Sequence, residues 1–217
     1  MKRRTDELID LLVCDARPVR PLLPPVCRAA VWLMLALAVM AVLIVSPRAD
    51  LMIKLAEPRF LAEQAGAPLT AAGAASAAFA LVVPGIDTRL ALLPALPGLA
   101  WVGTLGAGCL ADFWRAGSAA LALSPDASCV LYIAAIGAPP VAVGLAMLRR
   151  GMPAHPRLTL FLIALAAAAI GNFGLRLFHV RDAGMMVLVW QFGSVLLLSA
   201  LAALAGPRAF RRSVPMS

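Results

Sequence analysis

Six blocks of apolar residues constrain the fold of this chain more than any other feature. Several of them reach the roughly 20 residues that a helix needs to cross the hydrocarbon of a lipid bilayer. A helix is favoured there because it satisfies its own backbone hydrogen bonds, which lipid cannot do. The blocks cover residues 29–45, 68–83, 90–110, 129–148, 158–178 and 185–205, and the helix of the second block could begin as early as Phe60. We therefore expect an all-α membrane protein, a six-transmembrane-helix bundle.

The overall composition supports a membrane protein. Of the 217 residues, 62% are hydrophobic and only 14% are charged, whereas soluble domains are nearer half apolar and a quarter charged. The first apolar block begins beyond an acidic segment and several prolines, unlike the apolar part of a secretory signal peptide. We therefore expect the first span to remain in the mature chain.

The distribution of lysine and arginine predicts the orientation of the spans. Positive charge near span ends is retained in the cytoplasm, and a cytoplasmic N-terminus places thirteen of the nineteen basic residues on that side. The outer segments then hold Arg48, Lys54, Arg59, Arg115, Arg176 and Arg181. Both chain ends are therefore expected in the cytoplasm. The net charge of +8 reflects this topology and contact with anionic lipid, without direct binding of nucleic acid.

The predicted topology divides the chain into three parts. Residues 1–27 form a cytoplasmic N-terminal segment, residues 28–206 the transmembrane domain, and residues 207–217 a basic cytoplasmic tail. No predicted span has Asp, Glu, Lys or His near its centre, although transport of a charge or a polar solute needs such groups there. Asn172 and Gln191 fall at similar depths on neighbouring spans, and we expect them to form a structural hydrogen-bonded pair.

The motifs of enzymes are absent from the sequence. It has no Gly-rich phosphate loop, no paired metal-ligand motif, no nucleophile with an obvious base, and no C-x-x-C of a thiol oxidoreductase. We therefore expect no enzyme activity. A small transporter or channel, or a quinone-linked thiol oxidoreductase, is the alternative that these absences disfavour.

Small residues and prolines predict how the helices pack. Ala167 and Gly171 have the small-xxx-small spacing that lets two helix backbones approach closely. Pro94 and Pro97 each remove a backbone donor from the third span. We expect them to kink that helix.

The four cysteines are divided by the predicted topology between two compartments. Cys14 and Cys27 are cytoplasmic, where thiols stay reduced, while Cys109 ends the third span and Cys129 opens the fourth, at the outer face. His179 follows the fifth span on the same face. Thiolate and imidazole together suit a soft metal ion such as zinc or cadmium. A redox or metal role for the outer residues therefore competes with simple packing, in which cysteine acts as a small apolar residue.

The N-terminal segment is predicted to be a short amphipathic helix followed by a stiff Pro-rich linker. Thr5 is a suitable N-cap, and Leu8, Leu11 and Leu12 form an apolar stripe on an otherwise acidic helix. A helix this short is marginal alone, so we expect it to dock on a protein partner. The alternative is a helix that lies on the bilayer surface. Repulsion between its acidic face and anionic lipid disfavours that arrangement.

Short motifs follow one another along almost the whole chain. They are Leu8-Ile-Asp-Leu-Leu12, Pro18-Val-Arg-Pro-Leu22, Glu57-Pro-Arg-Phe60, Ser128-Cys129, Arg149-Arg-Gly151, Pro156-Arg-Leu158, Leu177-Phe-His-Val-Arg-Asp182 and Val187-Leu-Val-Trp190. Their order, together with six spans, resembles the NrsF-type membrane anti-sigma factors of bacteria. These are the negative regulators of sigma-F-like extracytoplasmic-function sigma factors.

The resemblance implies a function and a set of site residues. The N-terminal segment would hold the sigma factor at the bacterial inner membrane, and an outer-face signal sensed by cysteines would release it. Cys129 matches the family's cysteine at the start of the fourth span, whereas His179 stands where a second cysteine is expected. Cys109 would then pair with Cys129 to sense an oxidant, or Cys and His would bind a soft metal. The sigma-factor contacts are expected at Leu8, Ile9, Asp10, Leu11, Leu12 and Asp15.

Overall fold

The computed structural model is helical throughout the residues that it describes. These are residues 2–14, 22–44, 46–123, 127–151, 153–180 and 183–210. The α-helices are α1 (Lys2–Cys14), α2 (Pro25–Leu43), α3 (Leu51–Leu55), α4 (Pro58–Ala80), α5 (Ala95–Ala116), α6 (Ala127–Leu148), α7 (Pro156–Phe178), α8 (Gly184–Met186) and α9 (Gly193–Ala209). Tighter 3₁₀ turns η1 (Thr88–Leu92) and η2 (Gly117–Leu121) flank α5, and the π-helical η3 (Val187–Phe192) joins α8 to α9. The prediction of an all-α fold is confirmed for this part of the chain.

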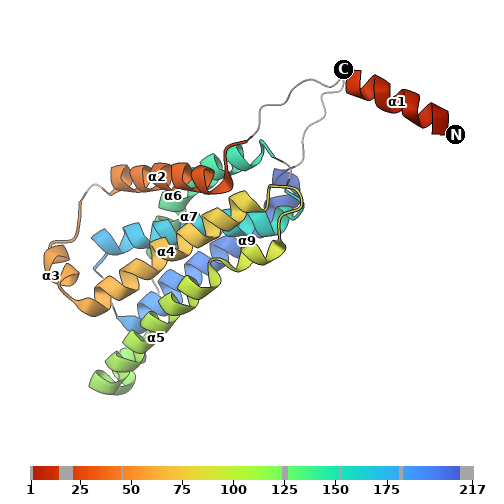
Figure 1. Ribbon diagram of the computed structural model, residues 1–217. Helices are drawn as coiled ribbons and strands as arrows, with labels where there is room; N and C mark the ends of the chain where they lie inside the picture. The colour runs from red at the N-terminus through yellow and green to blue at the C-terminus, as the bar shows by residue number, and fades with distance from the viewer. Residues whose placement is uncertain are drawn as a thin grey trace.

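Long helices pack side by side into one bundle, in which consecutive helices run in opposite directions (Figure 1). They are α2, α4, α5, α6, α7 and α9. At one end, Arg28 at the start of α2 donates a hydrogen bond of 2.8 Å to the carbonyl of Met147 near the end of α6. At the other end, the amide of Arg48 donates to the carbonyl of Leu177 over 2.9 Å. We call this second end the α3 end, because α3 lies there.

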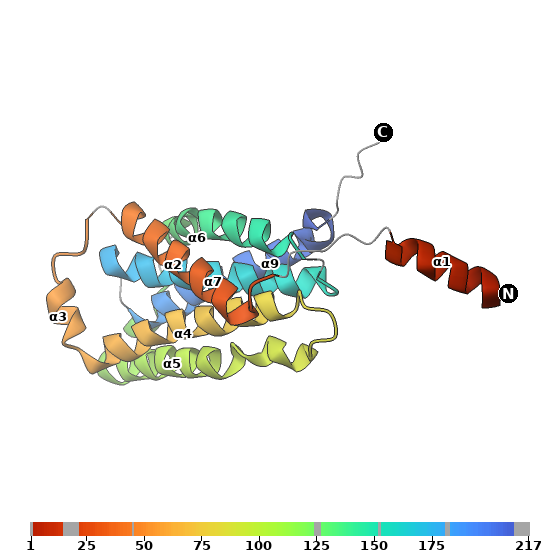
Figure 2. The same ribbon diagram turned by 45° about the horizontal axis from the view of Figure 1, so that its top comes forward.

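The helix α7 lies at the centre of the bundle. It packs against α4, α6 and α9, and Figure 2 shows it between α6 and α4, with α2 running obliquely across it. In its most apolar stretch 83% of the residues are buried, against 17–33% in the other helices that are apolar enough to span a membrane. The alanines of its middle turns explain this position, because small side chains let neighbours approach from several directions.

The predicted close approach of two helix backbones is confirmed at Gly171. A Cβ atom at this position would lie 2.7 Å from the carbonyl oxygen of Ile133 in α6, which is closer than such atoms pack. One turn earlier, Ala167 is fully buried. Its carbonyl oxygen would lie 3.3 Å from a Cβ atom at Gly137 of α6. The contact between α6 and α7 therefore depends on residues that have almost no side chain.

Five helical segments in the described residues are long and apolar enough to cross a membrane. They are Pro25–Leu43, Thr88–Leu121, Ser128–Leu148, Pro156–Phe178 and Gly184–Ala209. The predicted span 68–83 belongs to α4, which is not among them. α4 has 23 residues, begins two residues before the alternative start at Phe60, and includes Arg59 and Glu63 in its first turns. Alanine and glycine make up much of the rest, so its mean hydropathy is low although most of the helix is buried.

The start of α5 corrects the prediction of a proline kink in the third span. Pro94 is the N-cap residue of α5, and Pro97 lies in its first turn. Proline is tolerated there because the first N–H groups of a helix have no acceptor within it. These prolines therefore begin the helix, and the predicted kink is wrong.

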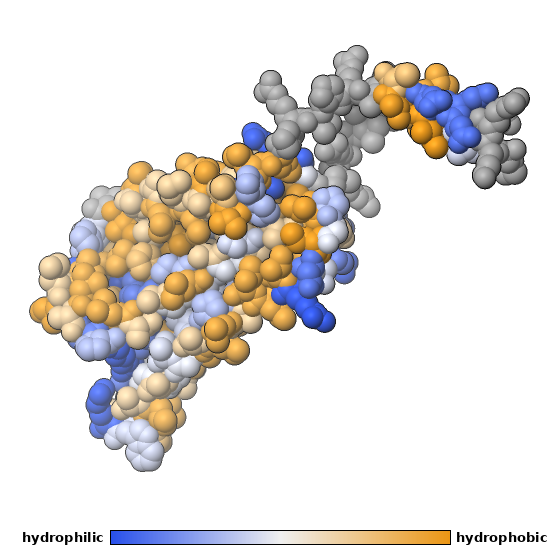
Figure 3. Space-filling model, viewed as in Figure 1, coloured by the Kyte–Doolittle hydropathy of each residue, from blue (hydrophilic) through white to orange (hydrophobic). Residues whose placement is uncertain are grey.

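Large apolar side chains cover much of the visible outer surface of the bundle (Figure 3). Examples on four different helices are Met34, Leu99, Leu131 and Leu204, all of them exposed. Soluble monomers rarely expose so much contiguous apolar surface. A surface of this kind is typical of helices that face lipid.

Candidate functional site

Two of the predicted sensing residues, Cys129 and His179, lie in contact at the α3 end. The Sγ atom of Cys129 is 3.8 Å from Nε2 of His179, within reach of a hydrogen bond to sulfur. Cys129 lies in the first turn of α6 and is 2% exposed, while His179 is the C-cap residue of α7. An imidazole at this distance can take up the thiol proton. The thiolate that remains is the form of cysteine that reacts with oxidants and binds soft metals.

Arg48, in the segment between α2 and α3, fixes the backbone at His179. Its Nη1 donates to the carbonyl oxygen of His179 over 3.2 Å. Asp50 in turn holds the guanidinium through hydrogen bonds of 2.6 and 2.9 Å. These hydrogen bonds lower the pKa of Asp50 below its ordinary value, so the ion pair persists at neutral pH. The chain that enters α3 is therefore attached to the segment that carries His179.

The third predicted sensing residue, Cys109, lies at a different place in the bundle. It is half-buried on α5 and packs against α8, where a Cβ atom at Gly184 would lie 2.7 Å from its Cα. All four cysteines belong to the described part of the chain and are present as thiols. In that part, no group of three His, Cys, Asp or Glu side chains is arranged to hold a metal ion. The structure thus brings Cys129 to His179 and places Cys109 against α8.

The predicted sigma-factor contacts lie on α1, except for Asp15, which falls outside the described residues. The helix begins at Lys2, so Thr5 lies inside it and the prediction of Thr5 as N-cap is wrong. The apolar side chains are exposed: 56% for Leu8 and 64% for Leu12, with Ile9, Leu11 and Val13 similar.

The apolar and acidic side chains of α1 face opposite ways. At about 100° per residue, the three leucines and Ile9 share one broad side of the helix and Asp6, Glu7 and Asp10 the other, while Val13 lies at the border, close to the direction of Asp6. Figure 3 shows the two kinds of surface next to each other along α1. An amphipathic helix with an uncovered apolar side is suited to dock in the groove of another protein.

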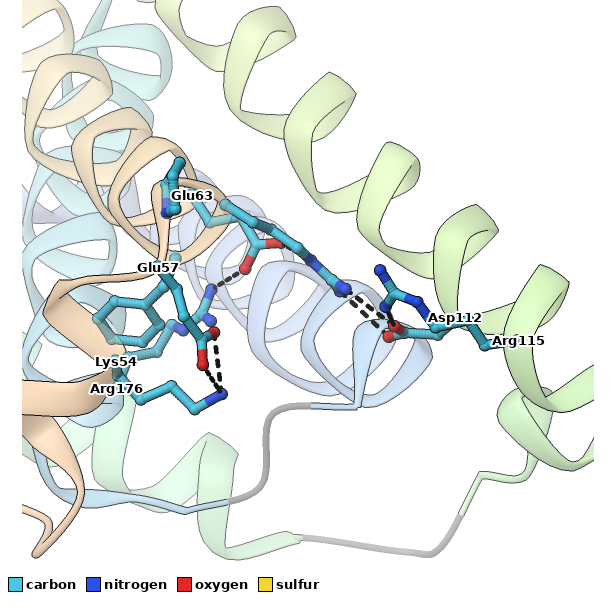
Figure 4. Close-up of a pocket in the computed structure, with 9 residues that line it drawn as sticks. Lys54, Glu57, Glu63, Asp112, Arg115 and Arg176 are labelled. Atoms are coloured by element: carbon cyan, nitrogen blue, oxygen red, sulfur yellow. Dashed lines mark hydrogen bonds and ion pairs between the residues drawn. The ribbon is translucent and has the colours of Figure 1, made fainter.

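A network of ion pairs lies at the α3 end (Figure 4), and it was not predicted from the sequence. Glu63 of α4 accepts hydrogen bonds from Arg176 of α7 over 2.7 Å and from Arg59 over 2.9 Å. Glu63 and Arg176 are 4% and 2% exposed. Arg59 reaches on to Asp112 of α5 through bonds of 2.8 and 3.1 Å. The network therefore fastens α4, α5 and α7 together.

The sequence did contain a signal for this network. Ionisable residues stand near the outer ends of three predicted spans, at Glu63, Asp112 and Arg176. Charge at that depth is costly against lipid, so such groups turn into a bundle and pair with one another. Which of these residues pair with each other depends on how each helix is rotated about its own axis, and the sequence does not determine that rotation.

The predicted hydrogen bond between Asn172 and Gln191 is wrong. Both side chains are buried as expected. In the described part of the chain, however, Oδ1 of Asn172 and Oε1 of Gln191 have no hydrogen-bond partner. Gln191 lies in the π-helical η3, where the wider turn rotates side chains away from the register of a regular α-helix.

These features define a class of protein: a bundle of helices suited by length and composition to a membrane, with an amphipathic helix that exposes its apolar side. The family described as NrsF, negative regulator of sigma F, matches residues 12–211. The chain therefore belongs to this family, as the order of its motifs predicted. No curated protein and no solved structure matches it.

Family membership makes this protein a negative regulator of sigma F, an anti-sigma factor, and implies a sigma factor as its partner. The family match begins at Leu12 and so leaves out most of α1. Any role of α1 therefore has to be argued from the helix itself.

Proposed function

We propose that this anti-sigma factor resides in the bacterial inner membrane and holds an extracytoplasmic-function sigma factor through α1. The observation that carries this proposal is the exposed apolar side of α1, formed by Leu8, Ile9, Leu11 and Leu12. Burial of one such leucine against a partner contributes about 1.5–3 kcal/mol. Two or three of them supply much of the affinity of a regulatory complex.

The acidic side of α1 supports the same kind of partner. Asp6, Glu7 and Asp10 give this side a negative charge. Sigma factors bind DNA, and proteins that bind the phosphate backbone do so with lysine and arginine. The carboxylates on this side are therefore complementary to such a basic surface, although Lys2, Arg3 and Arg4 in the first turn balance their charge over the helix as a whole. Occupation of that surface by α1 would keep the sigma factor away from its promoters.

The proposed topology has six crossings and a cytoplasmic N-terminus, with α4 as the crossing that composition alone does not identify. Its support is the alternating direction of the long helices, which puts the start of α2 and the end of α6 at one end of the bundle. The burial of α4 against α5 and α7 further favours a crossing, because a helix inside a bundle needs less apolar surface than one that faces lipid.

We place the sensing step at Cys129 and His179, on the outer face in this topology. An oxidant that reacts with the Cys129 sulfur would break its contact with His179, whereas a soft metal ion such as zinc or cadmium would replace the thiol proton and bind both side chains. The support for this step is their 3.8 Å separation and the reactivity of a thiol that lies beside an imidazole.

The experiment that tests the role of α1 uses the double substitution Leu8→Asp and Leu12→Asp. The full-length protein is purified in mild detergent together with a sigma-F-type factor of the same organism. Loss of two buried leucines should weaken retention of the sigma factor by at least about a hundredfold, since 1.4 kcal/mol is a factor of ten in affinity. The amount of protein in the membrane should not change.

The matched control is Glu7→Gln, which alters one charge on the acidic side and leaves the apolar side intact. It should weaken retention only a fewfold. Full retention of the sigma factor by the double variant would refute the role of α1. If α1 instead lies on lipid, the double variant should change surface binding of α1 and leave transcription of sigma-dependent genes as it was.

A further inference from the structure

A pocket of about 540 Å³ opens at the α3 end, next to the buried ion pairs (Figure 4). Its walls come from α3, α4, α5 and α7 and the turn before α4, and seven of its nine lining residues are charged. The pocket is separate from the contact between Cys129 and His179, neither of which lines it. A cavity lined in this way suits a polar or charged ligand.

The charges that line the pocket do not balance. Lys54 and Glu57 neutralise each other through hydrogen bonds of 3.0 and 3.1 Å. The remaining lining charges are the guanidinium groups of Arg59, Arg115 and Arg176 and the carboxylates of Glu63 and Asp112. Three positive groups and two negative groups therefore line the pocket. The net charge of the lining residues is +1.

Each carboxylate oxygen of the network already accepts a hydrogen bond. Those of Glu63 accept from Arg59 and Arg176. One oxygen of Asp112 accepts from Arg59 and Arg115, and the other from Arg59 and the amide of Gly184. Every carboxylate oxygen therefore already has a donor, while a guanidinium carries five N–H donors. The pocket offers a surplus of donors as well as of positive charge.

Arg115 is the most loosely held of the three arginines. Its side chain is 73% exposed, and its contact with Asp112 is long, at 3.4 Å. An exposed pair of this kind contributes little to stability, so the side chain can turn toward a ligand at small cost. Arg59 is about one-third exposed and lies across the same carboxylate. These two guanidinium groups form the accessible part of the excess charge.

The geometry points to a binding site for a phosphate-type anion at the mouth of the pocket, which Arg115 binds beside Arg59 by turning away from its long contact with Asp112. Guanidinium groups bind phosphate through paired N–H bonds that match its oxygens. The volume exceeds that of a phosphate ion, so the site accommodates a larger group that carries the phosphate. The shared chemistry admits two sources, a soluble phosphate compound or the headgroup of an anionic phospholipid.

The first measurement titrates the full-length protein in neutral detergent with inorganic phosphate, at constant ionic strength kept with chloride. Saturable binding is expected, and Arg115→Gln should weaken it at least about tenfold because one charge-assisted contact is lost. Arg115 is exposed, so this variant keeps its fold. The matched control is Arg89→Gln, an exposed arginine of η1 outside the pocket, which should bind as the wild type does.

The second measurement distinguishes the two sources. The protein is placed in nanodiscs of phosphatidylcholine, with or without phosphatidylglycerol, and its thermal midpoint is recorded. A rise with phosphatidylglycerol that Arg115→Gln removes and Arg89→Gln keeps identifies the lipid headgroup as ligand, whereas binding of inorganic phosphate without such a rise identifies a soluble anion. The proposal is overturned if neither ligand binds, or if Arg115→Gln and the wild type respond alike. Neither result depends on retention of the sigma factor by α1.

Discussion

Arg176 and His179 lie three residues apart at the C-terminal end of α7, and each contacts a different helix. Arg176 donates to Glu63 of α4 over 2.7 Å, while Nε2 of His179 is 3.8 Å from the Sγ atom of Cys129 in α6. The last turn of α7 thus joins the buried ion pairs to the cysteine site. A chemical change at Cys129 that displaces His179 would also strain the pair between Arg176 and Glu63.

Loss of the Glu63 charge should destabilise the bundle strongly. In Glu63→Gln, the guanidinium of Arg176, which is almost fully buried, loses its charged partner on α4. Removal of one member of a buried ion pair costs about 3–5 kcal/mol. Unfolding by denaturant in neutral detergent measures the change. The control Glu57→Gln breaks a partly exposed pair with Lys54, for which we expect less than about 1 kcal/mol; equal losses in the two variants would contradict a special role for Glu63.

Reporter fusions should show whether α4 crosses the membrane. In the proposed topology, fusions after Asp50 and Gly117 report the periplasm, and fusions after Gly85 and at the C-terminus report the cytoplasm. Asp50 and Gly85 flank α4, so their fusions give opposite signals only if this helix spans. The same signal at both positions would leave the protein with an odd number of crossings and its two ends on opposite sides.

The response to oxidants and soft metals should depend on Cys129 more than on Cys109. Cys129→Ser removes the sulfur that contacts His179 and should abolish induction of sigma-dependent transcription by either stimulus. His179→Ala should weaken it, because the thiol loses its proton acceptor.

The matched control for that experiment is Cys109→Ser, since Cys109 packs against α8. We expect this variant to keep most of the response, as read from a transcriptional reporter in intact cells. An unchanged response in Cys129→Ser would leave the cysteines as packing residues. Equal loss in both serine variants would instead favour a disulfide between them, formed after a rearrangement of α5.

The contact between α6 and α7 should not tolerate even one added methyl group. Gly171→Ala places a Cβ atom 2.7 Å from the carbonyl oxygen of Ile133, and overpacking of this kind costs about 1–3 kcal/mol. Gly103→Ala is the matched control, because nothing lies within 4 Å of its added Cβ atom. That variant should gain about 0.5–1 kcal/mol from better helix propensity. Thermal unfolding of both variants should show a lower midpoint for Gly171→Ala and a higher midpoint for Gly103→Ala than for the wild type.

Most of the helices could be predicted because an apolar block of membrane length has few alternatives to a helix. The start of α4 is ambiguous in the sequence, anywhere from Phe60 to Pro68. Arg59, Glu63 and Gln64 interrupt its hydropathy, so a window average excludes them from a span. Their burial results from partners on α5 and α7, and these contacts exist only once the bundle has formed.

The residues of the proposed sensing site could be predicted from the sequence, but the contacts between them could not. Topology puts Cys109, Cys129 and His179 at the same end of the bundle, yet contact between any two depends on how each helix is rotated about its axis. A step of one residue changes that rotation by about 100°, and the apolar pattern of a lipid-exposed helix does not fix it. The structure rotates Cys129 toward His179 and Cys109 toward Gly184.

The small side chains around α7 have a mechanical consequence. With 23 residues the helix is about 34 Å long, and backbone rather than flexible side chains meets it at Gly171. At the N-terminal end of α7, the backbone packs equally closely against α9. A Cβ atom added to Gly206 of α9 would lie 2.7 Å from the carbonyl oxygen of Pro156. Because backbone meets backbone at both contacts, side chains cannot rearrange there to absorb a displacement of α7. A displacement of the last turn of α7 would therefore shift the whole helix along its axis as a rigid body, and α9 would move with it.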